Sequence, residues 1–148
     1  MPTSEDPLVF RGAGRRLPRR RLRAFAEEVA REVAGSRGFV CLITGDRELR
    51  RLNRQFLGKD YPADVLSFPE PGPDGFLGEL AISVDRARDQ ALTRGHSLEQ
   101  EIQILMLHGL LHLVGMDHES DRGRMARAET RWRKKLGLPA GLIERVRS

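Results

Sequence analysis

Apolar residues recur along the chain with two periods, one typical of helices and one typical of strands. Between Pro18 and about Ala34 they return every three or four positions, which predicts an amphipathic helix that Gly35 ends. The run Phe39–Thr44 is short, continuous and rich in β-branched residues, so it predicts a buried strand. The same patterns predict strands at 8–10, 65–68 and 76–84, and helices from the Asp46 cap to Gly58, from the Asp85 cap to about Arg94, from Ser97 to Leu113 and from Ser120 to about Leu136.

The order of these elements is strand, helix, strand, helix, two strands and three helices. It predicts an α+β fold in which a small mixed β-sheet of about four strands packs with five to six helices. Residues 102–114 are apolar almost throughout, which indicates a central buried helix rather than a surface helix. We expect one domain over residues 1–148, with flexible ends at 1–7 and 140–148.

Composition narrows the class of protein. With 39% hydrophobic and 32% charged residues in 148, the chain is too apolar for general disorder. The net charge is +5, and all but three of the 26 basic residues are arginine. Arginine binds phosphate in a bidentate manner, so an anionic partner such as nucleic acid is one explanation, and the codon bias of a GC-rich genome is the other. A lone cysteine, Cys41, excludes an internal disulfide and a CxxC zinc site.

No apolar run is long enough to span a membrane, and the first residues lack the pattern of a signal peptide. We therefore expect a cytoplasmic protein with no membrane partner.

Three of the four histidines fall in one short window. His108 and His112 are four residues apart on the predicted central helix, so both imidazoles project from one face. Gly115 allows the chain to leave the helix and bring His118 back towards them. Three neutral imidazoles with an open fourth position form a catalytic zinc site. The alternative is that each ring satisfies its own hydrogen bonds in the core, but three buried polar rings on one apolar helix favour metal binding. The fourth histidine, His96, is predicted to lie in a loop.

The histidine spacing is that of the metzincin proteases, H-E-x-x-H-x-x-G-x-x-H. In those enzymes the glutamate after the first histidine is the general base. Here Gly109 stands at that position, and it has no side chain for proton transfer. Peptide hydrolysis by that mechanism is therefore not expected.

The string HGLLHLVGMDH at 108–118 closely resembles the signature of the YbeY family, bacterial metal-dependent endoribonucleases of ribosomal RNA maturation. Three other segments resemble further motifs of that family and occur in the same order, namely LNRQF at 52–56, DVLSFP at 64–69 and LGELAIS at 77–83. Met125 and Glu129 also match residues usual in the last helix of the family. The resemblance covers about residues 9–136.

The resemblance implies one Zn²⁺ ion per chain, held by His108, His112 and His118. It implies a single-strand-specific endoribonuclease that acts in ribosomal RNA maturation and ribosome quality control, with the ribosome or ribosomal proteins as partners. Zinc would activate water for attack on a phosphodiester. Since aromatic residues are only 5% of the chain, electrostatic contacts with the RNA backbone should outweigh base stacking.

The remaining candidate residues are less sharply defined. Asp117 either acts as a catalytic acid or base, or orients a histidine or caps the turn. The family usually carries arginine where this chain has Leu57, so Arg54 or Lys59 could replace it as a substrate-binding phosphate clamp, with Lys59 also a catalytic candidate. Ser67 either lines the substrate cleft or follows the alternation of a half-buried strand.

Two alternative functions stay open. One is a metal-dependent hydrolase of peptides or small molecules, which Gly109 disfavours. The other is a ribosome-associated factor with weakened catalysis, which Leu57 favours. The sequence predicts no oligomeric state.

Overall fold

The computed structural model describes residues 6–12, 16–117 and 121–147. Its sheet has the spatial order β1-β2-β4-β3, with β1 parallel to β2, β2 parallel to β4, and β3 antiparallel to β4 at the edge. The strands are β1 (Leu8–Phe10), β2 (Phe39–Thr44), β3 (Val65–Pro69) and β4 (Gly78–Ser83). The predicted mixed sheet of four strands is confirmed.

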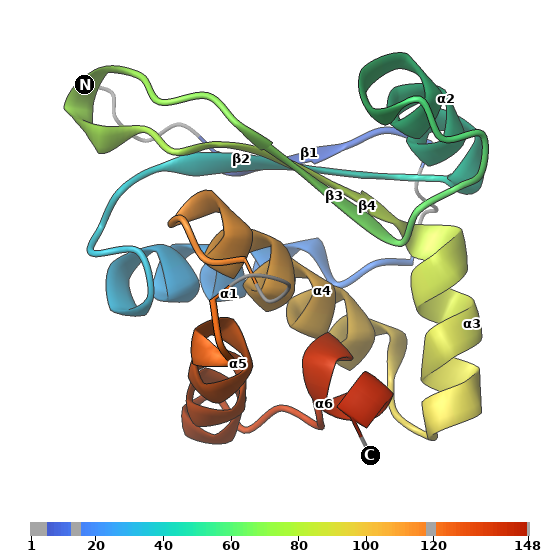
Figure 1. The fold of residues 1–148 in the computed structure, drawn as a ribbon. Coiled ribbons are helices and arrows are strands. Elements are labelled where there is room, and N and C mark those ends of the chain that lie inside the picture. Colours follow the sequence, from blue (N-terminus) through green and yellow to red (C-terminus); the bar gives the residue numbers. More distant parts are fainter. Residues whose placement is uncertain (1–5, 13–15, 118–120, 148) are drawn as a thin grey trace.

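Helices cover both faces of this sheet (Figure 1). They are α1 (Arg19–Glu32), α2 (Asp46–Leu57), α3 (Val84–Arg94), α4 (Leu98–Leu113), α5 (Arg124–Lys135) and α6 (Leu142–Arg147), with a short 3₁₀ turn, η1 (Pro73–Gly75), in the loop before β4. Helix α2 lies on one face, while α1 and α4 lie on the other, and α5 and α6 pack beyond α4. The alternation along β4 explains the two layers, because Leu80 and Ile82 join the core around α4 whereas Ala81 packs with Leu49 of α2.

Helix α4 is central and buried, as predicted. The sheet lies on one side of it and α5 and α6 lie on the other. A polar face on this helix would therefore be buried away from water. A reciprocal cap begins the helix: the Gln100 backbone N–H donates to Ser97 Oγ and the Ser97 N–H donates to Gln100 Oε1, each at 3.0 Å.

The prediction that Asp46 and Asp85 cap the helices they begin is wrong, because Asp85 caps the start of α2 and Ser83 caps the start of α3. The Asp46 N–H of α2 donates to Asp85 Oδ2 at 2.8 Å. The α3 start is capped by Ser83, whose Oγ accepts from the Arg86 N–H at 3.1 Å and donates to Asp46 Oδ1 at 2.6 Å. The polar groups thus join α2 to α3 across the end of the sheet.

The C-terminal part of the chain differs in detail from the sequence prediction. Helix α5 begins at Arg124, after Gly123 with φ +85°, rather than at Ser120, which lies outside the described residues. Residues 142–147, treated as an end segment in the sequence prediction, form helix α6 against α4 and α5. Within the described ranges, no helix combines the length and apolarity that a bilayer crossing requires.

Candidate metal centre

Helix α4 brings two of the three predicted zinc ligands together. His108 and His112 are one helical turn apart, and their rings meet edge to face with centroids 5.0 Å apart. His108 is 7% exposed, while His112 is half-buried. The third predicted ligand, His118, lies outside the described residues. The part of the chain that the structure describes holds no group of three or more metal-ligating side chains.

Hydrogen bonds fix which nitrogen of each ring carries the proton. His108 Nδ1 lies 2.8 Å from Glu129 Oε2, and His112 Nδ1 lies 3.0 Å from the Met116 carbonyl oxygen. A carbonyl or carboxylate oxygen accepts, so each Nδ1–H donates, and the lone pair of each neutral ring sits on Nε2. Zinc-binding histidines in proteins are held in this way by an oxygen on the second nitrogen. The two rings therefore fit a zinc ion in tautomer and in donor type.

The turn after α4 supplies the oxygen that orients His112. The Met116 N–H donates to the Leu111 carbonyl at 3.1 Å, and Gly115 adopts φ +99°, which favours glycine. Asp117 follows, exposed, and its carbonyl accepts from the Asp121 N–H at 3.1 Å. This contact joins the turn to the approach to α5.

Gly109 allows a close approach between α4 and the sheet. A Cβ at this position would lie 2.8 Å from Leu80 Cδ2 and 3.2 Å from Val65 Cγ2. The position that carries glutamate in the metzincin pattern thus faces the sheet here. Gly109 therefore lacks a side chain that could act as a base, and the position also has no space for one.

Ser67 lies at the same junction. Its Oγ donates to the Gly109 carbonyl oxygen at 3.1 Å, which links edge strand β3 to α4 one residue beyond His108. The structure therefore brings Ser67 close to the histidine pair, in a contact that holds helix and sheet together.

Arg54 and Lys59 belong to the α2 side of the sheet, opposite the face that α4 covers. Arg54 Nη1 lies 3.6 Å from Asp60 Oδ1, and its side chain is 63% exposed. Lys59 and Leu57 line a hollow of about 410 Å³ beside α2, whose lining also includes Arg86 of α3. The two predicted phosphate-binding residues are thus arranged around the end of α2.

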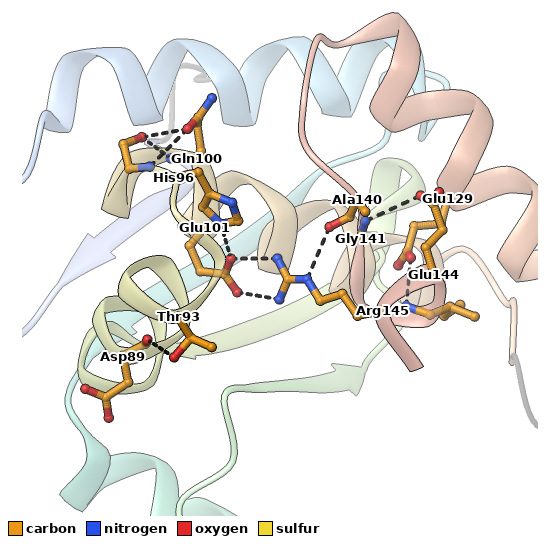
Figure 2. A network of polar contacts seen from close by, with 12 residues as sticks. Asp89, Thr93, His96, Gln100, Glu101, Glu129, Ala140, Gly141, Glu144 and Arg145 are labelled. Atoms are coloured by element: carbon orange, nitrogen blue, oxygen red, sulfur yellow. Dashed lines mark hydrogen bonds and ion pairs between the residues drawn. The ribbon is translucent and has the colours of Figure 1, made fainter. Parts of the chain in front are cut away.

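A buried ion pair formed by a residue of α4 was not predicted from the sequence (Figure 2). Glu101 is fully buried, and it accepts from Arg145 Nη1 at 2.9 Å and from Arg145 Nη2 at 2.7 Å. His96 lies in the predicted loop, but its Nε2 is 2.6 Å from Glu101 Oε1. Burial raises the pKa of Glu101, but the hydrogen bonds from Arg145 and His96 outweigh burial, so the pKa is below its ordinary value.

The contact of Glu129 with His108 was also not predicted from the sequence, although Glu129 matches a residue usual in the family. Its carboxylate joins His108 to the Ile143 backbone N–H, which donates to Oε1 at 2.9 Å. The sequence signal was the match of Glu129 to the family within the predicted helix of residues 120–136, whereas its burial is known only from the structure.

Fold and site define a class of protein, a small α+β domain whose buried central helix presents two oriented imidazoles near its C-terminal end. The family model described as Endoribonuclease YbeY matches residues 15–137. The chain is 62% identical over 141 residues to Endoribonuclease YbeY of Solibacter usitatus, covering 95% of both chains. It is 54% identical over 118 residues to Endoribonuclease YbeY of Koribacter versatilis, covering 79% of this chain and 77% of the relative.

A solved structure is also similar. The solution structure of TM1509 from Thermotoga maritima aligns with a TM-score of 0.59 at 26% identity, covering 84% of this chain and 85% of that chain. The chain belongs to the YbeY endoribonuclease family.

Proposed function

We propose that the protein is a zinc-dependent, single-strand-specific endoribonuclease that acts in ribosomal RNA maturation and ribosome quality control in the cytoplasm. The observation that carries the metal assignment is the pair of rings on α4, each with Nδ1 bonded to an oxygen. The endoribonuclease activity rests on family membership. The ribosome or ribosomal proteins would be the partners of the enzyme.

Different residues of the chain would bind the metal, orient its ligands and transfer protons. His108 and His112, with His118 as the third ligand, would hold one ion per chain through Nε2. A zinc ion held there supplies Lewis-acid activation of water and of the phosphodiester. Glu129 keeps the His108 ring in place, and the Met116 carbonyl does the same for His112. Asp117, on the turn between His112 and His118, is the proposed acid or base.

Basic and polar side chains on either side of edge strand β3 would bind the RNA substrate. Ser67 on the α4 side and Lys59 and Arg54 on the α2 side would contact the RNA backbone. Contacts of this kind are independent of base sequence and weaken as salt rises. A peptidase activity is disfavoured, because position 109 faces the sheet.

Zinc content tests the metal site. Wild type is expected to carry one zinc ion per chain by elemental analysis, and His112→Gln to carry much less, because a three-histidine site loses one ligand. His96→Gln is the matched control, since His96 bonds Glu101, and it should keep its zinc. Zinc-free wild-type protein after purification in zinc, or full zinc in His112→Gln, would contradict the assignment.

Leu57→Arg tests whether the missing family arginine limits activity. Leu57 is 54% exposed beside Lys59 and lines the hollow next to α2, so arginine fits without disturbing the core. The added guanidinium should strengthen phosphate contact, and we expect RNA cleavage to rise about tenfold, corresponding to one charge-assisted hydrogen bond. Steady-state cleavage of a single-stranded RNA at two salt concentrations measures the gain, with Leu57→Gln as the uncharged control. An unchanged rate would show that the chain works without this clamp.

A further inference from the structure

The C-terminal segment lies directly behind one of the metal-ligating histidines. The Ile143 N–H donates to Glu129 Oε1 at 2.9 Å, and Glu129 Oε2 lies 2.8 Å from His108 Nδ1. Glu129 is 1% exposed, so its two oxygens depend on these buried partners. One carboxylate therefore joins the start of α6 to the ring of His108. The family model ends at residue 137, before this segment.

Gly141 brings the backbone of the segment against Glu129. A Cβ at this position would lie 2.5 Å from Glu129 Cδ and closer still to Oε1. Gly141 has no positive φ, so its backbone conformation would tolerate alanine, and the atoms nearest to an added Cβ all belong to Glu129. The small residue is thus required by the position of the carboxylate.

Arg145 holds the other end of the segment on the helix that carries the histidines. Its guanidinium binds both oxygens of Glu101, and its Nε donates to the Ala140 carbonyl at 3.2 Å (Figure 2). Glu101 lies two turns before His108 on α4, so both residues face the same side of the helix. The segment is therefore tied to α4 directly through Arg145 and to His108 indirectly through Glu129 of α5.

We propose that residues 140–145 are a positioning element of the metal site. The segment fixes the Glu129 carboxylate through the Ile143 N–H and the close approach of Gly141, and the carboxylate in turn fixes the tautomer and orientation of His108. This inference rests on the proposed zinc site. Loss of an outer partner of a zinc-binding histidine lowers metal affinity about 10–100-fold, and we expect a loss in this range when Glu129 is displaced.

Zinc affinity of the full-length protein, measured by competition with a chromogenic chelator, tests the proposal. Gly141→Ala is expected to bind zinc at least about tenfold more weakly, because its Cβ displaces Glu129. Gly38→Ala is the matched control, since a Cβ there meets only Phe76 Cδ1 at 3.7 Å, and it should bind like wild type. Arg145→Lys keeps the charge opposite Glu101 but loses the two-pronged contact, and an intermediate affinity is expected.

Thermal unfolding of the zinc-free proteins separates positioning from general stability. A purely structural role lowers the melting temperature and leaves the zinc affinity of the folded fraction unchanged, which would overturn the proposal. If Gly141→Ala does not fold, Arg145→Lys decides, and wild-type affinity in that variant would likewise overturn it. An error in the zinc assignment itself would give a different result, because the wild-type protein would then bind no zinc.

Discussion

Gly109→Glu, which would complete the protease-like motif, is expected to destabilise the protein by more than about 3 kcal/mol and to give no peptidase activity. The side chain would enter the contact between α4 and the sheet, where the Leu80 side chain is 1% exposed and lies 2.8 Å from an added Cβ. Overpacking and a buried carboxylate without a partner both contribute to the loss. Urea unfolding and a casein assay measure the two effects.

The smaller substitution at the same site provides a graded control. Gly109→Ala adds one methyl group against Leu80 and Val65, and a loss of about 1–2 kcal/mol is expected. A Gly109→Glu protein as stable as wild type, or one that hydrolyses casein, would show that position 109 is open to the metal site.

Arg145→Ala is expected to lower the free energy of unfolding by about 3–5 kcal/mol at neutral pH. The substitution leaves Glu101 charged and buried, and of the two side chains that contact it in this network only His96 remains. This loss is a large fraction of the total stability of a domain of this size. Arg21→Ala is the matched control, because it removes a similar two-pronged contact to Glu99, two residues away on α4, but with an exposed arginine. Little change is expected in that variant.

The difference between wild type and Arg145→Ala should shrink in acid. In wild type the pKa of Glu101 lies below its ordinary value of 4.5, so its contribution is full above that pH and is lost as pH falls through the folded-state pKa. Without Arg145, burial favours the neutral acid, so protonation stabilises the variant as pH falls. Urea unfolding at pH 7 and at pH 4 should show the gap narrowing. A gap independent of pH would mean that Glu101 is not the group left uncompensated.

The sequence predicted the parts of the site that depend on local spacing. His108 and His112 share a face because a helix repeats about every four residues, and the continuous apolar run of residues 102–114 already indicated a buried helix. The mixed sheet followed from short apolar runs separated by turns and helices. These features are encoded within one segment at a time.

The parts that escaped prediction depend on contacts between segments far apart in the chain. Glu129 meets His108 across 21 residues, and Arg145 meets Glu101 across 44. The capping of α2 by Asp85 of α3 likewise needs two helix starts to lie side by side. The spacing of residues within one segment does not predict such pairings, because they depend on which segments the fold brings together.

We propose that the oriented histidines on α4 hold a metal that the cleavage of RNA requires. The most direct measurement is cleavage of a fluorescent single-stranded RNA by the zinc-loaded protein, by the same protein stripped with a chelator, and by the stripped protein after zinc is restored, each beside His112→Gln. We predict cleavage by the loaded protein, its loss on stripping, its return with zinc, and none by His112→Gln under any condition. Equal cleavage by the stripped protein, or by His112→Gln, would show that the metal held by these histidines is not required for cleavage.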